Sequence, residues 1–192
     1  MSDTWRVFCA IDLPTDLKQK LAIHIEQLKK ETGIKAGWIR PENIHLTIKF
    51  LGNIPVSDVN KLSLATARAI ETLVPFKITA EHCGAFPTYG PPRILWIGIK
   101  DSSSQLARLY ERLEEECAAV GFTKEARSFH PHLTIARVRH AANASALGTA
   151  HRVLQFPPTE FAVNELLVIR SELGKDGPKY TTVSTHGLGE FH

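Results

Sequence analysis

Apolar residues recur along the chain at two spacings, one typical of helices and one typical of strands. The helical spacing of three and four residues occurs in four segments. Gly33 and Gly121 follow two of these segments and are expected to end helices, and Ser57 is an expected cap of another. The pattern therefore predicts four helices, over residues 16–32, 56–73, 104–120 and, more weakly, 143–154.

Between the helices, apolar and polar residues alternate, which is the pattern of strands with one buried face. A loop rich in glycine and proline (residues 87–92) separates two of these strands, and a turn is expected at GKDGP (residues 174–178). The expected strands cover residues 5–13, 36–40, 43–52, 76–83, 93–99, 122–126, 132–138, 161–170 and 179–188.

After the opening strand, the elements repeat four times in the order helix–strand–strand. The four units form two similar halves that meet near residues 100–104, and no glycine- and serine-rich linker or charge run separates the halves. Short connections between strands favour antiparallel pairing. We therefore expect residues 1–192 to form one compact α+β domain with two similar lobes.

The tetrapeptide HLTI occurs twice, from His45 and from His132, at corresponding positions of the two halves. Successive side chains of a strand point to opposite faces, so His132 and Thr134 share one face of the second copy. In the first copy His45, Thr47 and Lys49 share a face. The opposite face is expected in the core and holds Ile44, Leu46, Ile48 and Phe50. Two lobes related by a pseudo-two-fold axis can bring the two His-x-Thr strands together across a cleft.

Two histidines and two threonines that face one cleft suit proton transfer at a phosphodiester. An imidazole pKa of about 6.5 lets one neutral ring act as the base while the other, protonated, acts as the acid. Threonine hydroxyls can donate hydrogen bonds to the phosphate oxygens, so no metal is required. A metal site of His45, His130 and His132 is the open alternative. It is disfavoured because no Asp or Glu stands in an obvious ligand position nearby.

The composition narrows the class of partner and compartment. A formal net charge of only +3 favours a local pocket for RNA or a nucleotide over a long electrostatic groove. The cysteines, Cys9, Cys83 and Cys117, have the spacing of neither a zinc site nor a disulfide framework. No segment approaches the roughly 20 apolar residues of a membrane span, and the N-terminus lacks a secretory pattern. We expect a cytoplasmic monomer with free thiols.

The sequence around both motifs resembles the two-histidine phosphoesterase superfamily. It is most similar to the LigT-like branch, the bacterial and archaeal RNA 2',3'-cyclic phosphodiesterases, historically called 2'-5' RNA ligases. The resemblance covers nearly the whole chain and rests on RVFCAIDLP, WIRPENIHLTIKFLG, PPRILWIGI, FHPHLTIARV and RSELGKDGPKY. It implies a bilobed, pseudo-two-fold fold in which two antiparallel sheets line a central cleft and helices lie outside.

The resemblance also implies a reaction and its residues. The reaction is the opening of a terminal 2',3'-cyclic phosphate to a 2'-phosphate, without a cofactor. His45 and His132 would be catalytic, and Thr47 and Thr134 would bind the phosphate. We expect His132 to be the proton acceptor and His45 the proton donor.

Two further residues come from the resemblance, Arg137 for the phosphate or base and Phe50 for stacking on a base. Regular strand alternation points both side chains away from the histidines. Either a bulge or strand end re-aims them, or they serve the core and the outer rim. We favour a place in the site for Arg137, because a guanidinium can pair with phosphate. For Phe50, stacking on a base and packing in the core remain equally open.

Hydrolysis is the leading function, and two alternatives remain. One is 2'-5' RNA ligation at RNA ends such as tRNA halves, the same chemistry with a 5'-hydroxyl in place of water. The other is a non-catalytic module that binds RNA ends, which the presence of both histidines and both threonines disfavours. No P-loop or dinucleotide-binding glycine motif occurs, which argues against an ATP-dependent ligase. The expected partner is RNA with a 2',3'-cyclic phosphate end or a small cyclic nucleotide. No association with a membrane is expected.

Other candidate residues are assigned to structural roles. Trp38 and Trp96 are expected in the core, and a structural role is favoured for Tyr180 over a place at the cleft border. Arg93 and Arg127 fit a surface charge at least as well as RNA attraction. The remaining histidines are expected at the surface or the core edge, with His24 facing solvent: His24, His82, His140, His151 and His186.

Overall fold

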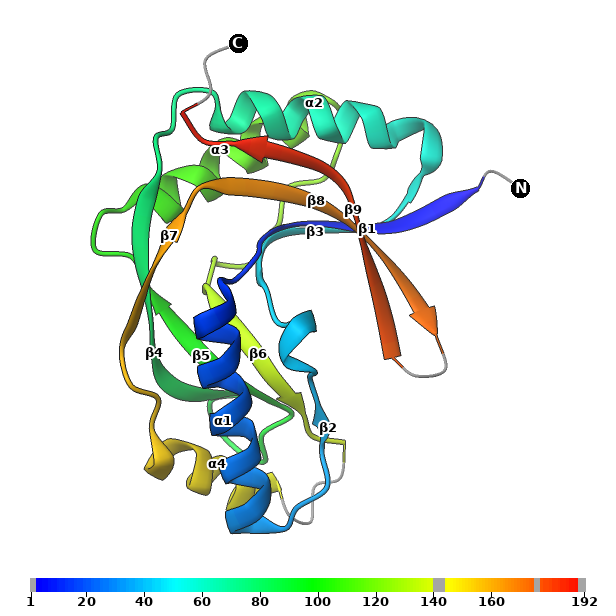
Figure 1. The fold of residues 1–192 in the computed structure, drawn as a ribbon. Helices are drawn as coiled ribbons and strands as arrows, with labels where there is room; N and C mark the ends of the chain where they lie inside the picture. Colours follow the sequence, from blue (N-terminus) through cyan, green and yellow to red (C-terminus); the bar gives the residue numbers. More distant parts are fainter. Residues whose placement is uncertain (1–2, 140–143, 175–176, 190–192) are drawn as a thin grey trace.

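The computed structural model describes residues 3–139, 144–174 and 177–189 and has the mixed helix and strand composition expected from the sequence (Figure 1). Its order along the chain is β1 (Thr4–Ile11), α1 (Thr15–Thr32), β2 (Gly37–Trp38), η1 (Pro41–Asn43), β3 (Leu46–Pro55), η2 (Val56–Asp58), α2 (Val59–Ile70), β4 (Phe76–Phe86), β5 (Ile94–Lys100), α3 (Gln105–Ala119), β6 (His132–Arg137), α4 (Ala144–Leu154), β7 (Thr159–Val163), β8 (Glu165–Gly174) and β9 (Gly177–Gly187).

The strands form two antiparallel sheets, one in each lobe of Figure 1. The four-stranded sheet has the order β3-β1-β8-β9, and the five-stranded sheet has the order β2-β6-β5-β4-β7. This confirms the expected α+β fold. Both sheets take strands from each side of residues 100–104, so that point of the chain does not divide one sheet from the other.

The helices cross between the lobes. Helix α1 follows β1 of the four-stranded sheet but packs with α4, which contacts β4 of the five-stranded sheet. Conversely, α3 follows β5 of the five-stranded sheet but contacts α2 and β3 on the other lobe. Each lobe therefore has a helix that directly follows a strand of the other lobe's sheet. None of the helices in the described part of the chain combines the length and apolar character needed to cross a membrane.

The buried faces of the helices agree with the apolar spacing. In α1 the side chains of Leu17, Leu21 and Leu28 are fully buried, and Gly33 ends the helix with a φ of 62° and an N–H bond to the Lys29 carbonyl. The expected cap at Ser57 is wrong, because α2 begins at Val59. Helix α2 also ends at Ile70, earlier than expected.

Two expected strands differ from the structure. Residues 161–170 are two strands, because β7 and β8 separate at Asn164 and enter different sheets. Residues 122–126 form no strand. Their backbone groups bond to side chains instead of a neighbouring strand: the Thr123 carbonyl accepts from Lys49, and the Glu125 N–H donates to Glu114.

These bonds belong to a buried ion pair that joins β3, α3 and the loop after α3. Lys49 Nζ lies 2.7 Å from Glu114 Oε1, and their side chains are 3% and 8% exposed. Lys49 Nζ also donates to the Thr123 carbonyl at 2.9 Å, and Glu114 Oε2 accepts from the Glu125 N–H at 2.9 Å. Each buried charge is thus both paired and hydrogen-bonded, the condition under which a buried pair is tolerated.

Two of the isolated histidines are in the core, contrary to expectation. His24 is 5% exposed and His151 is fully buried, because α4 covers the side of α1 that the sequence pattern left for solvent. His82 is exposed and His186 is half-buried, as expected for the surface and the core edge. His140, the start of the fourth expected helix at residue 143, and residues 175 and 176 of the GKDGP turn lie outside the described residues. All three cysteines are free thiols.

Replacing Glu114 by Gln is expected to lower the free energy of unfolding by about 3–5 kcal/mol, because the Lys49 ammonium remains buried without its counter-charge. Urea denaturation followed by circular dichroism measures the loss. The double variant Lys49→Met with Glu114→Gln is expected to regain part of the stability. Lys77→Met, which removes a solvent-exposed pair with Glu160, is the control and is expected to leave the midpoint nearly unchanged. A Glu114→Gln midpoint equal to that of the control contradicts this role.

Candidate active site

The two HLTI motifs lie in different sheets. Strand β3 is the edge of the four-stranded sheet, with His45 directly before it, and β6 lies inside the five-stranded sheet and begins with His132. The two strands contact each other across the lobes. Between them lies a cavity of about 110 Å³, lined by Ile39, Asn43, Ile44, His45, Thr47, His132, Thr134, Arg137 and Tyr180. The structure therefore brings both His-x-Thr pairs and Arg137 to one cavity.

Both motif histidines are held in the same way. The Nδ1 atom of His45 lies 2.9 Å from the Asn43 carbonyl oxygen, and the Nδ1 atom of His132 lies 2.6 Å from the His130 carbonyl oxygen. In each case the partner is the backbone two residues earlier. A carbonyl oxygen can only accept, so Nδ1 carries the hydrogen in both rings. Nε2 is then bare in the neutral ring and is the nitrogen that can take up or give a proton.

Aromatic side chains surround both imidazoles. The His45 ring stacks on Phe8 with centroids 4.6 Å apart, and the edge contact to Tyr180 is 5.2 Å between centroids. The His132 ring meets Phe86 edge to face at 5.2 Å and lies 6.2 Å from Trp96. These neighbours fix the ring planes and remove water from one side of each imidazole.

Burial lowers the pKa of both His45 and His132 below the ordinary histidine value, because it disfavours the charged imidazolium. The hydrogen bonds to the Asn43 and His130 carbonyls oppose this shift in both cases, but burial is the larger effect. Both rings therefore favour the neutral form. A phosphate between them would favour protonation, since an anion nearby stabilises the imidazolium.

A β-bulge changes the faces of β3. Strand β1 pairs Cys9 with Lys49 and Ala10 with Thr47, so Ile48 is an extra residue. The alternation shifts after Ile48, and the expected faces of the next two residues are wrong. Lys49 is buried against α3, and Phe50 is 52% exposed at the cleft rather than in the core.

The second motif strand has a matching bulge. Strand β5 pairs Trp96 with Thr134 and Leu95 with Ala136, so Ile135 is the extra residue of β6. Arg137 consequently lines the cavity with Thr134 although it lies three positions further on. Of the alternatives that the sequence left open for Arg137, the structure has the bulge.

The cleft extends beyond the small cavity on both sides of His132. A cavity of about 500 Å³ is lined by Thr47, Phe50, Tyr110, Arg127, Phe129 and His132, among others. The Arg6 guanidinium lies over the Phe50 ring, 4.7 Å from its centroid. The rings of Tyr110 and Phe129 stack with their centroids 4.2 Å apart. A third cavity, of about 550 Å³, lies between His132, Trp96 and Lys100. A substrate larger than a phosphate therefore has room on either side.

Two aromatic residues of the cleft differ from their expected structural roles. Tyr180 lines the small cavity, although the sequence favours a structural role for it. Trp96 lines the third cavity rather than lying wholly in the core, while Trp38 packs against the core as expected. Alternation along β9 and β5 shows which neighbours share a face of the strand with Tyr180 and Trp96. Whether that face meets the cleft depends on the order of the strands in the sheets.

The remaining candidates divide between the cleft and the outer surface. Arg127 lines the cavity that contains Phe50 and forms an ion pair with Glu125 at 3.0 Å. Arg93 is exposed and lines a different surface hollow, with Pro92 and Arg139. Over the described ranges, His45, His130 and His132 do not form a group compact enough to share one metal ion.

The chain is similar in sequence to a known protein family over most of its length. The sequence model of the 2'-5' RNA ligase superfamily matches residues 17–175. RNA 2',3'-cyclic phosphodiesterase of Thermotoga maritima is 33% identical over 175 residues, which covers 91% of each chain. The Archaeoglobus fulgidus protein of the same name is 33% identical over 176 residues, covering 91% of this chain and 96% of its own.

Solved structures show the same fold. Escherichia coli LigT complexed with 3'-AMP has a TM-score of 0.75 at 24% identity, covering 98% of this chain and all of its own. A Thermus thermophilus protein has a TM-score of 0.76 at 26% identity, covering 97% of this chain and all of its own. The match over most of the sequence, the relatives at 33% identity and the shared fold show that this chain belongs to the 2'-5' RNA ligase superfamily, the two-histidine phosphoesterases.

Proposed function

We propose that this protein is an RNA 2',3'-cyclic phosphodiesterase that opens a terminal 2',3'-cyclic phosphate to a 2'-phosphate. The observation that carries the proposal is the pair of His-x-Thr motifs, one from each sheet, around a single cavity. The relatives that carry this name and align over nearly the whole chain support it.

The proposed reaction needs one base and one acid on opposite sides of the phosphorus. His132, neutral and with Nε2 bare, takes a proton from a water molecule whose oxygen forms a bond to phosphorus. The bond from phosphorus to the 3' oxygen breaks, and protonated His45 gives its Nε2 proton to that oxygen. The product carries a 2'-phosphate and a 3'-hydroxyl, and the two histidines have exchanged protonation states.

The other residues of the cavity stabilise the charge that builds up on the phosphate. The Thr47 and Thr134 hydroxyls donate hydrogen bonds to the two non-bridging oxygens, one from each wall. Arg137 adds a permanent positive charge at the same cavity. These donors replace the role that a metal ion plays in other phosphodiesterases, so the reaction is expected to proceed without metal.

Phe50 is proposed to contact the nucleobase next to the cyclic phosphate. Its ring is half-exposed and lines the cavity adjacent to Thr47 and His132. A ring in this position offers an apolar face to any base, because each base has a flat face that stacks. This arrangement suits an RNA end without a strict sequence preference.

Replacing either His45 or His132 by Ala is expected to lower kcat by about 10²–10⁴-fold, because each variant lacks one proton-transfer group. The assay is hydrolysis of an oligonucleotide 2',3'-cyclic phosphate in the presence of EDTA. His186→Ala, at a half-buried histidine that lines none of the three cavities around the motifs, is the matched control and is expected to keep wild-type kcat. Undiminished turnover in either motif variant overturns the two-histidine mechanism.

The pH dependence of kcat/KM is expected to be bell-shaped, because the free enzyme must hold one neutral and one protonated histidine. Burial lowers both pKa values, so activity is expected to fall on the alkaline side once pH passes the higher of the two, below about 6.5. Initial rates at low substrate concentration from about pH 4 to about pH 9 measure the two limbs on either side of the histidine range. An alkaline limb that begins well above about pH 7 contradicts the assignment.

Phe50→Ala is expected to raise KM for a cyclic-phosphate oligonucleotide by about 5–100-fold, the value of one base–aromatic stack, with a smaller change in kcat. Phe50→Tyr keeps the ring and is expected to retain most of the affinity. Leu64→Ala removes another exposed apolar side chain, on α2, and serves as the control. Equal KM values for Phe50→Ala and Leu64→Ala exclude a stacking role.

A further inference from the structure

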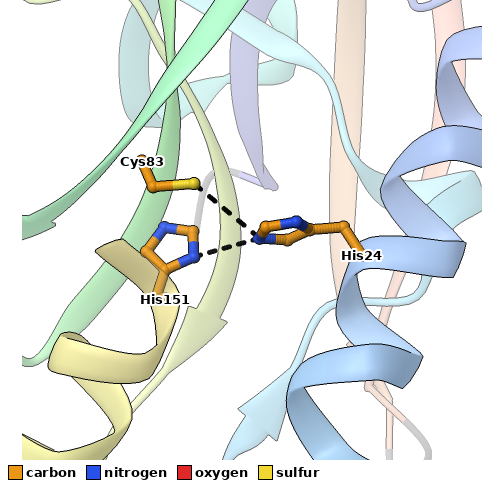
Figure 2. Close-up of side chains that lie close together, drawn as sticks. All are labelled: His24, Cys83 and His151. Carbon is orange, nitrogen blue, oxygen red and sulfur yellow. Dashed lines mark hydrogen bonds between the residues drawn. The ribbon is translucent and has the colours of Figure 1, made fainter. Parts of the chain in front are cut away.

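A second cluster of chemically reactive side chains lies among the described residues, between the helices and the five-stranded sheet. Figure 2 shows His24 of α1, Cys83 of β4 and His151 of α4 pointing toward one another. His24 Nε2 lies 3.1 Å from His151 Nδ1, and Cys83 Sγ lies 3.9 Å from His24 Nε2. All three atoms lie within 4.8 Å of one another. None of the three residues lines the cavities around His45 and His132.

The tautomer of His151 is fixed by its other nitrogen. His151 Nε2 lies 3.0 Å from the Trp96 carbonyl oxygen, which can only accept. Nε2 therefore carries the hydrogen, and Nδ1 presents its lone pair to His24 and Cys83. Such an outward bond to a backbone carbonyl is the usual support of a metal-binding histidine, since it orients the ring and sets the tautomer.

A bulge in β4 turns Cys83 into the cluster. Strand β5 pairs Gly98 with Glu81 and Ile97 with Cys83, so His82 is the extra residue, with a φ of 63°. Regular alternation from Ala80 would place His82 on the helix-covered face and Cys83 on the cleft face. The bulge reverses this, leaving His82 exposed and the Cys83 thiol beside two buried imidazoles.

The hydrogen bond between the imidazoles accounts for two members of the cluster but not for the third. A thiol is a weak hydrogen-bond donor and acceptor, so the pair does not need it. Burial lowers the pKa of both histidines, that of His24 to about 4, and raises the pKa of the Cys83 thiol to about 12, so without a metal the imidazoles are neutral and the thiol keeps its proton. Two neutral imidazoles and one thiolate are ligands typical of zinc.

We propose that His24, Cys83 and His151 bind one Zn²⁺ ion that ties α1 and α4 to the five-stranded sheet. Zn–N bonds of about 2.0–2.1 Å and Zn–S bonds of about 2.3 Å in a tetrahedron place nitrogens about 3.3 Å apart and N–S pairs about 3.6 Å apart. The separations of 3.1 and 3.9 Å lie within a few tenths of an ångström of these values, while Cys83 Sγ and His151 Nδ1, which lie within 4.8 Å of each other, would have to approach by up to about 1.2 Å. These residues supply three of the four ligands, so a water molecule would have to be the fourth.

Binding redistributes two protons. His24 Nε2 loses to solvent the hydrogen that it donates to His151, and Nδ1 of the same His24 ring gains one. His24 therefore stays neutral. The Cys83 thiol loses its proton, and one proton per zinc is released overall. The ion lies on the helix-covered face of the sheet, so its removal is expected to lower stability and leave the proton transfers at His45 and His132 in place.

The test is a titration of the EDTA-treated, desalted full-length protein with Co²⁺ and then with Zn²⁺. One equivalent of Co²⁺ is expected to give the charge-transfer band of a thiolate–cobalt bond and visible bands of tetrahedral intensity, which Zn²⁺ then abolishes. Cys83→Ser is expected to lose the charge-transfer band and bind Zn²⁺ at least tenfold more weakly. Cys117→Ser, a buried cysteine outside the cluster, is the matched control and is expected to behave as wild type.

A measurement on the unaltered protein covers the case in which a variant does not fold. One equivalent of Zn²⁺ is expected to raise the Tm of the wild type and to protect Cys83 from alkylation, mapped by mass spectrometry. His24→Gln is expected to lose the Tm increase, and His186→Gln to keep it. Either a wild type without the cobalt charge-transfer band or an alkylation rate of Cys83 unchanged by zinc overturns the site. Hydrolysis of cyclic-phosphate RNA is a separate readout and does not enter this test.

Discussion

The geometry of the cleft depends on one feature of β-structure, the alternation of side chains along a strand and its interruption at a bulge. In both motif strands the first part is regular and places His and Thr on the cleft face. One extra residue then follows, Ile48 in β3 and Ile135 in β6, and the alternation shifts. The shift turns Phe50 and Arg137 toward the cleft and buries Lys49. The proposed site for a phosphate and its nucleoside thus comes from two short segments.

The two walls belong to different sheets, so their separation depends on how the lobes are joined. The helices exchanged between the lobes provide part of that connection, since α1 packs with α4, which contacts β4 of the sheet that β1 does not enter. The buried Lys49–Glu114 pair provides another. It holds β3 directly after the first motif to α3 and to the loop that leads toward β6. Rigid walls would matter for the proposed reaction, because proton transfers to and from two oxygen atoms of one phosphate tolerate little misplacement.

The helical spacing of apolar residues predicted the inward helix faces, short connections favoured the antiparallel α+β fold, and strand alternation predicted that His and Thr of each motif share a face. These patterns failed where a distant part of the chain decides the outcome. The bulges depend on pairing with β1 and β5, and His24 is buried by a helix more than a hundred residues later in the chain. Tyr180 reaches the cavity because β9 joins the sheet that contains β1, an order that no local pattern encodes. Residues 122–126 lack strand structure because buried side chains bond to their backbone.

The proposed mechanism requires both motifs to hold one phosphate between the two sheets at once. A crystal structure of the protein with adenosine 2'-monophosphate, the type of product that the proposed reaction leaves, tests this most directly. The phosphate is expected within about 2.6–3.2 Å of Nε2 of both His45 and His132 and of both threonine hydroxyls. A phosphate that contacts only one His-x-Thr pair, or that binds elsewhere on the protein, would contradict the account.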